Sequence, residues 1–110
     1  MINFNQKIFF SYTIRDGFIS KELLKKFKEN LYSIGIQNTF IDLIDNLENV
    51  NPQKKIYKEI KNSAVICIIY TPKVFTSPWV ITEIMLALKH FKPLIIIKYS
   101  SFIDICNYSK

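Results

Sequence analysis

One stretch organises the rest of the chain: Thr76-Ser77-Pro78-Trp79-Val80-Ile81-Thr82-Glu83-Ile84. It has the pattern of a helix start, because Ser77 can cap the first free N–H groups and Pro78 needs no N–H at the first helical position. The residues that follow are mostly apolar as far as Phe91. One carboxylate, Glu83, lies inside this apolar run, where an acid must be solvated, paired or functional.

Four apolar runs rich in branched and aromatic residues predict β-strands, at residues 7–12, 36–41, 65–70 and 94–98. Their nearly continuous apolarity indicates burial on both faces, as in a parallel sheet. The second run contains Gln37 and Asn38 and is expected at an edge of the sheet. Helical periodicity predicts helices at 20–34, 51–62 and 77–91, and Gly35 is placed for a left-handed helix stop.

This alternation predicts an α/β fold, a flavodoxin-like parallel sheet with helices on both faces. Four to five strands are expected in the order 2-1-3-4-5, the fifth being a short strand near residues 102–106. Ligands of such sheets bind outside the carboxyl ends of the strands, where the strand order reverses. The loops at 11–17 and 71–77 flank that reversal, so Arg15 and Glu83 are expected at one crevice.

The length predicts a single domain over residues 1–110 with a core at about 7–98, and a content of 49% hydrophobic and 22% charged residues excludes a disordered chain. No apolar run approaches the roughly 20 residues of a membrane span, and the N-terminus lacks the pattern of a signal peptide. Cys67 and Cys106 lie in apolar segments and are expected to be buried thiols. The expected compartment is therefore the cytoplasm.

The formal net charge of +6 does not predict a nucleic-acid partner. Arg15 is the only arginine and the lysines are scattered over polar helix faces, whereas proteins that read nucleic acids cluster their charge and rely on arginine. His and Cys residues do not have the spacing of zinc ligands. No metal and no cofactor are expected.

A helical wheel places Glu83 at the edge of an apolar stripe. The stripe comprises Val80, Ile84, Ala87, Leu88 and Phe91. Two interpretations of Glu83 are open. It is either an exposed helical side chain paired with a lysine or with His90, or a crevice carboxylate with a shifted pKa.

Arg15 and Trp79 also have two interpretations each. Arg15 either offers a bidentate fork to a phosphate or forms a surface salt bridge with Asp16 or a neighbouring residue. No glycine-rich phosphate loop accompanies it. Trp79 either belongs to the core or stacks on a nucleobase at the crevice.

Several segments resemble the conserved boxes of Toll/interleukin-1 receptor (TIR) domains, in the order of that family. Residues 77–84 are similar to the Ser/Asp-x-Trp-Cys/Val-x-x-Glu-Leu/Ile signature of the third helix. Residues 7–16, 40–42, 63–72 and 93–97 resemble the segments around the first four strands, with Asp42 just before the loop called the BB loop.

The resemblance implies an enzyme that takes NAD⁺ as its substrate and cleaves the nicotinamide–ribose bond, giving ADP-ribose or a cyclic ADP-ribose. It implies that Glu83 is the catalytic residue and that Ser11 and Arg15 meet the phosphates. The substrate-binding residues that it implies are Phe10, Ser11, Tyr12, Arg15, Asp42 and Trp79. The loop at 42–50 is expected to act as a lid.

Other TIR domains act only by assembling with one another, so a non-enzymatic interaction module is the alternative. As an enzyme, the chain resembles the TIR component of bacterial anti-phage (Thoeris-type) systems, which implies a downstream effector that senses the nucleotide product. The loop at 42–50 lacks the glycine usual in the family. The short segment after the fourth strand is expected to leave a sheet edge open, which favours self-association.

Overall fold

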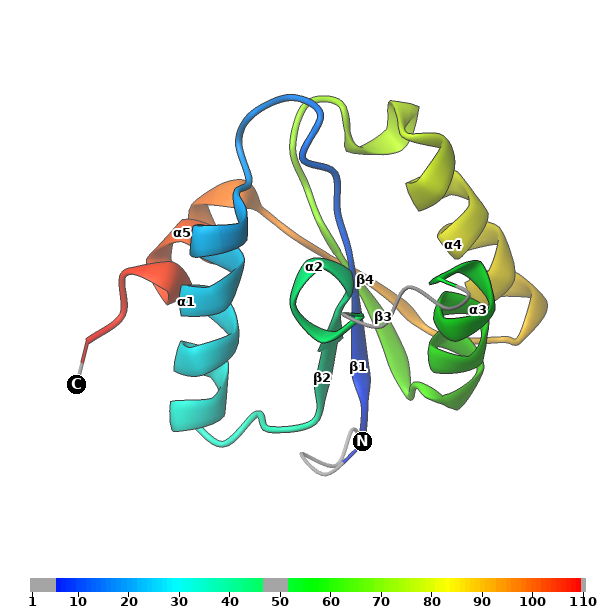
Figure 1. Cartoon of the computed structure of the whole chain (residues 1–110), viewed down its shortest axis with the longest axis horizontal. Coiled ribbons are helices and arrows are strands. Elements are labelled where there is room, and N and C mark those ends of the chain that lie inside the picture. The colour runs from blue at the N-terminus through cyan, green and yellow to red at the C-terminus, as the bar shows by residue number, and fades with distance from the viewer. Residues whose placement is uncertain (1–5, 47–51, 110) are drawn as a thin grey trace.

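The structure is a computed structural model that describes residues 6–46 and 52–109. The predicted lid loop is described as far as Asn46, and residues 47–51 lie outside the described part. Four parallel strands form one sheet in the order β2-β1-β3-β4 (Figure 1). They are β1 (Ile8–Ser11), β2 (Thr39–Ile41), β3 (Val65–Ile69) and β4 (Leu94–Ile97). The predicted flavodoxin-like arrangement is therefore confirmed, with β2 at an edge.

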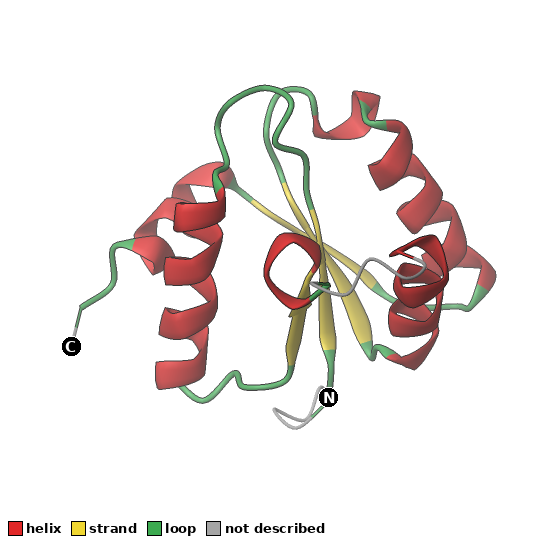
Figure 2. Ribbon diagram, viewed as in Figure 1, coloured by secondary structure: helices red, strands yellow, loops and turns green. Residues whose placement is uncertain are grey.

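Helices cover both faces of the sheet (Figure 2). On one face lie α1 (Lys21–Ser33) and α5 (Tyr99–Cys106), and on the other lie α3 (Pro52–Asn62) and α4 (Pro78–Lys89). A single helical turn, α2 (Asp42–Asp45), follows β2 directly, and a short 3₁₀ turn, η1 (Val74–Thr76), precedes α4. The sequence predicted α1, α3 and α4, while it predicted only a loop where α2 lies.

Neighbouring residues of the strands point to opposite faces of the sheet, so each face has its own apolar packing. On β1, Phe10 packs with α1 and α5, while Phe9 packs with α3 and α4. On β3, Cys67 and Ile69 join the first core and Ile66 joins the second. Burial of central strands on both faces explains why their sequences are apolar without alternation.

The prediction of a fifth strand at 102–106 is wrong, because these residues belong to helix α5. Phe102 and Cys106 are one helical turn apart and both are buried against α1, where Phe102 contacts the ring of Phe27 at a centroid distance of 4.8 Å. A short apolar run does not distinguish a strand from a buried helix. Packing against α1 decides the outcome here.

The apolar stripe predicted on α4 is only partly buried. Val80 and Ala87 are inaccessible, but Leu88 is 59% exposed and Phe91 is 93% exposed. The helix ends at Lys89, and Phe91 takes a left-handed backbone conformation with φ of 57°. Gly35 has φ of 101° after α1, so the predicted left-handed stop is confirmed there.

Both cysteines are free and buried, as predicted. Cys67 lies in the central strand β3, and its burial raises the pKa of the thiol to about 12. Cys106 lies at the end of α5, where its thiol donates to the carbonyl of Leu23 at 3.3 Å. Thiols in this protonated, enclosed state contribute packing rather than reactivity.

Replacement of Phe102 by Ala tests the packing of α5. The ring is fully buried, so its removal is expected to lower the free energy of unfolding by about 3–5 kcal/mol. Urea unfolding of the full chain measures the change. Tyr108→Ala, at a position that is 47% exposed, is the control and is expected to cost about 0.5 kcal/mol or less. Equal losses in the two variants would show that α5 is not part of the folded core.

Candidate active site

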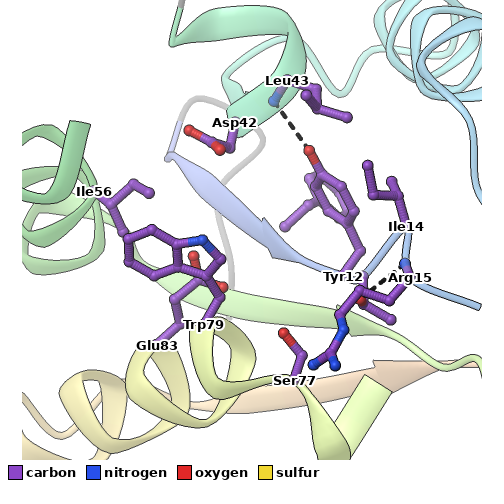
Figure 3. Close-up of a pocket in the computed structure, with 11 residues that line it drawn as sticks. Tyr12, Ile14, Arg15, Asp42, Leu43, Ile56, Ser77, Trp79 and Glu83 are labelled. Atoms are coloured by element: carbon purple, nitrogen blue, oxygen red, sulfur yellow. Dashed lines mark hydrogen bonds between the residues drawn. The ribbon is translucent and has the colours of Figure 1, made fainter. Parts of the chain in front are cut away.

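A cavity of about 230 Å³ lies beyond the carboxyl ends of the strands, where the chain reverses its order in the sheet (Figure 3). It is lined by residues of β1 and its following loop, of α2, of α3 and of the start of α4. They are Phe10, Tyr12, Thr13, Ile14, Arg15, Asp42, Leu43, Ile56, Ser77, Trp79 and Glu83. Four separate segments therefore converge on one crevice.

Glu83 is the buried acid of this cavity, with only 7% of its surface exposed. Its Oε1 accepts a hydrogen bond of 2.8 Å from the hydroxyl of Ser11. Burial raises the pKa of Glu83 to about 7; the Ser11 hydrogen bond opposes this rise, and the negative charge of Asp42 adds to it. The interpretation of Glu83 as an exposed helical side chain paired with a lysine or His90 is wrong.

The start of α4 fixes the direction from which Glu83 enters the cavity. Ser77 caps the helix by accepting from the backbone N–H of Val80 at 3.5 Å, and Pro78 occupies the first turn as predicted. Val80 is fully buried and anchors this turn on the sheet. Trp79 and Glu83, four residues apart, then lie on the same side of the helix.

Tyr12 ties the β1 end to α2. Its hydroxyl oxygen accepts a hydrogen bond of 3.0 Å from the backbone N–H of Leu43 (Figure 3). Burial is the main cause that raises the pKa of Tyr12, and the carboxylates of Asp42 and Glu83 raise it further. The phenol is therefore neutral at physiological pH and keeps an O–H that can donate into the cavity.

A second set of contacts holds α2 from its far side. The Lys28 ammonium of α1 donates to the carbonyl oxygen of Thr39 and to Oδ2 of Asp45, each at 2.9 Å. The same Asp45 oxygen accepts from the backbone N–H of Ile41 at 2.8 Å. These bonds fix the single turn of α2, so Asp42 is held at the cavity wall.

Arg15 and Trp79 lie at the mouth of the cavity. Arg15 is exposed, and the described residues form no ion pair with it. The carboxylate of Asp16, the predicted partner, instead accepts a hydrogen bond of 2.9 Å from the backbone N–H of Lys73. The alternative of a surface salt bridge from Arg15 to Asp16 or a neighbouring residue is therefore wrong for the described residues. Trp79 is 50% exposed beside Ile56, so it is not a core residue.

The structure gathers most of the predicted site residues around one cavity. Phe10, Tyr12, Arg15, Asp42 and Trp79 line it together with Glu83. Ser11 lies beneath, 1% exposed, with its hydroxyl engaged by the Glu83 carboxylate rather than turned to a phosphate.

The sequence missed other lining residues, among them Leu43, Ile56 and Ser77. Ser77 is predicted as a helix cap, and it also lines the cavity. No signal marked Leu43, because its place depends on the turn of α2.

Within residues 6–46 and 52–109, no three His, Cys, Asp or Glu side chains come together as a possible metal site. The same part of the chain contains no helix that is both long and apolar enough to cross a membrane. The charged and aromatic side chains that line the candidate site are those of Arg15, Asp42, Glu83, Phe10, Tyr12 and Trp79.

The sheet order and the crevice define a flavodoxin-like α/β domain with a buried acid at the point where the strand order reverses. A family model described as "TIR domain" matches residues 8–107, and the chain belongs to the TIR family. No curated protein matches the chain. TIR domains include both NAD-cleaving enzymes and signalling scaffolds, and they self-associate.

Replacement of Ser11 by Ala tests the hydrogen bond that lowers the pKa of the buried Glu83 carboxyl. Because the Ser11 hydrogen bond favours the charged carboxylate, its loss is expected to raise the Glu83 pKa above its value of about 7. Carbon-detected NMR titration of the side-chain carboxyl groups measures the shift. Ser63→Ala is a matched control, since Ser63 is equally buried but bonds to the backbone carbonyl of Glu59. An unchanged Glu83 pKa in Ser11→Ala would contradict the proposed contact.

The raised pKa also predicts how stability depends on pH. The folded state holds the Glu83 proton up to about pH 7, while the unfolded chain releases it near 4.5. Folding therefore loses stability as the pH rises from about 4.5 to 7, by about 3 kcal/mol in total. Glu83→Gln carries no such proton, so its stability relative to the wild type is expected to increase across this interval. Urea unfolding at a series of pH values measures the difference, and a constant difference would contradict it.

Proposed function

We propose that this TIR domain cleaves NAD⁺ at the bond between nicotinamide and ribose, with Glu83 as its catalytic residue. The observation that carries the proposal is the Glu83 carboxylate, buried at the wall of a cavity and held by Ser11. Loss of neutral nicotinamide leaves positive charge on the ribose. A carboxylate fixed in an environment of low polarity stabilises that charge as it develops.

The size of the cavity favours one half of the substrate. Its volume of about 230 Å³ is below the roughly 300–1,000 Å³ of pockets that enclose whole drug-sized ligands. It suits the nicotinamide and its ribose, which carry the bond to be broken. The pyrophosphate and the adenosine then lie across the mouth, where Arg15 is exposed and can bind phosphate oxygens in a bidentate manner.

The other lining groups have distinct parts in this proposal. Asp42 supplies a second negative charge, which favours the cationic nicotinamide ring of the bound substrate. Tyr12 offers its neutral O–H to an oxygen of the substrate. Phe10 and Trp79 bound the crevice with apolar surface that excludes water from the reacting bond. Ser11 acts as a positioning residue, because its hydroxyl donates its hydrogen bond to the Glu83 carboxylate.

The fate of the ribosyl cation decides the product. Capture by water, with release of a proton, gives ADP-ribose, whereas capture by an atom of the same molecule gives a cyclic ADP-ribose. We extend the proposal to a nucleotide signal that a downstream effector senses, as in anti-phage systems with TIR components. This extension and the choice of NAD⁺ as the substrate rest on the family, while the role of Glu83 is supported by its burial in the cavity.

A non-enzymatic module that works by TIR–TIR assembly is the second candidate. Exposed apolar residues on α4 and β4 favour it, because they offer a surface for association. It predicts association without consumption of NAD⁺, so a single assay for nicotinamide separates the two candidates.

Glu83→Gln tests the catalytic role with a side chain of the same shape. Concentrated wild-type protein is expected to release nicotinamide from NAD⁺, and the variant to release it at least about 100-fold more slowly. Liquid chromatography of free nicotinamide measures both rates. Glu22→Gln, on the exposed side of α1, is the matched control and is expected to retain the full rate. Equal rates in wild type and Glu83→Gln, or no release at any protein concentration, would overturn the proposal.

The pH profile tests the protonation state. Because the carboxylate is the active form, the rate is expected to rise through about pH 7 and to level off above it. Asp42→Asn removes a charge that raises the Glu83 pKa, so it is expected to move this rise to lower pH. A rise that stays in place in Asp42→Asn would show that another group controls the profile.

A further inference from the structure

An exposed apolar surface runs along α4, through the turn after it and onto β4. We call it the α4–β4 patch, and it consists of Ile81, Met85, Leu88, Phe91, Leu94 and Ile96. The exposed fractions of these residues range from 36% to 93%. None of the six carries a charge, although the patch lies on a chain with a net charge of +6.

The members of the patch on α4 lie toward the edge of the sheet. Helix α3 packs against one flank of α4, where the rings of Tyr57 and His90 meet at a centroid distance of 5.6 Å. Ile81, Met85 and Leu88 recur at the spacing of one helix face and occupy the opposite flank. Beyond that flank the sheet ends at β4 (Figure 1).

The members of the patch on β4 point to the same side of the sheet as α4. Leu94 is in register with Ile66 of β3, and Ile96 with Ile68. Ile66 and Ile68 pack under α3 and α4. Leu94 and Ile96 therefore extend that apolar face to the sheet edge, where they are 36% and 56% exposed.

The same two residues turn their backbone polar groups outward. The carbonyl oxygens of Pro93 and Ile97 accept from N–H groups on the β3 side, those of Ile66 and Tyr70. Alternate residues of a strand direct their N–H and C=O to opposite sides, so those of Leu94 and Ile96 face the open edge. Within the described residues no strand pairs with that edge. It is a template for a further strand.

Phe91 combines an unfavourable backbone conformation with a side chain that is almost fully exposed. Its backbone has φ of 57°, a conformation that favours glycine or asparagine, and its ring is 93% exposed. The ring gives almost no packing within the chain, while the backbone is strained. A contact outside the chain would give this exposed ring the packing that it lacks within the domain.

The area of the patch matches a protein interface. At roughly 200 Å² for a fully exposed side chain of this size, the six residues present roughly 700 Å². This exceeds the apolar patches of most monomers, which are about 300–600 Å². It is close to the ~800 Å² that each partner contributes to a standard interface.

We infer that the α4–β4 patch joins two copies of this chain edge to edge, with the two β4 strands antiparallel about a two-fold axis. TIR domains self-associate, and this inference assigns a surface and a geometry to that property in this chain. It does not rest on the proposed NAD⁺ cleavage.

A second copy fits because the patch is complementary to itself. A two-fold axis perpendicular to the sheet places both α4 helices on the same face, so Met85 and Leu88 pack against their counterparts in the partner copy. The outward groups of Leu94 and Ile96 then pair across the seam, and the sheet becomes continuous. Lys92 and Lys98 flank β4 at both ends, so like charges approach each other at the ends of the seam.

The oligomeric state of the full chain in solution tests this arrangement. Sedimentation velocity across micromolar concentrations is expected to show a monomer–dimer equilibrium that shifts toward the dimer as salt is added, since salt screens the lysines. Ile96→Lys is expected to raise the dissociation constant about tenfold or more. Ile34→Lys is the matched control, because Ile34 is 49% exposed at the end of α1, and it is expected to leave the dimer intact.

Phe91→Gly separates association from folding. It relieves the left-handed backbone, so the Tm of the monomer is expected to stay the same or rise while the dimer weakens. A wild-type chain that stays monomeric at all concentrations overturns the inference. A dimer that survives both Ile96→Lys and Phe91→Gly also overturns it, as does assembly beyond the dimer. A complex that dissociates when salt is added overturns it too, because that behaviour is expected of a surface that binds an acidic partner.

Discussion

The hydrogen bond between Ser11 and Glu83 is the contact on which the site depends. It joins the end of β1 to the second turn of α4, two segments that are 72 residues apart in the chain. It holds the Glu83 carboxylate at the wall of the crevice, where burial raises the pKa of this group to about 7. An acid held in this way costs folding free energy at neutral pH, because the unfolded chain ionises more readily. Stability sacrificed at a buried acid is typical of a functional site.

The remaining geometry of the crevice follows from how its walls are fixed. Tyr12 holds the backbone of α2 from inside the cavity, and Lys28 holds Asp45 from the side of α1. Between these two attachments, Asp42 is placed where its charge acts on Glu83. The central sheet provides rigidity, since β1 and β3 are buried on both faces. The candidate site residues lie at the carboxyl ends of the strands, on the loop after β1, the turn of α2 and the first turns of α4.

The two ends of α4 have different functions in this picture. Its first turns deliver Trp79 and Glu83 to the crevice, and its last turn and the edge strand expose Leu88, Phe91 and Ile96. The proposed active site and the proposed association surface therefore lie on one helix. Coupling between them has a physical route, because the position of α4 on the sheet sets both.

The sequence by itself determined the parallel α/β fold, the ends of its main helices and the cluster around Glu83. The reason is that central strands must be apolar on both faces, and that Ser77 and Pro78 form a strong local helix start. Tertiary structure alone decided that residues 102–106 are helical, that Ser11 serves Glu83 rather than a phosphate, and that Leu88 and Phe91 are exposed. Each of these depends on contacts between distant segments: α5 on α1, β1 on α4, and the end of the sheet at β4. Local patterns report which residues favour burial, but only the packed chain determines what lies opposite them.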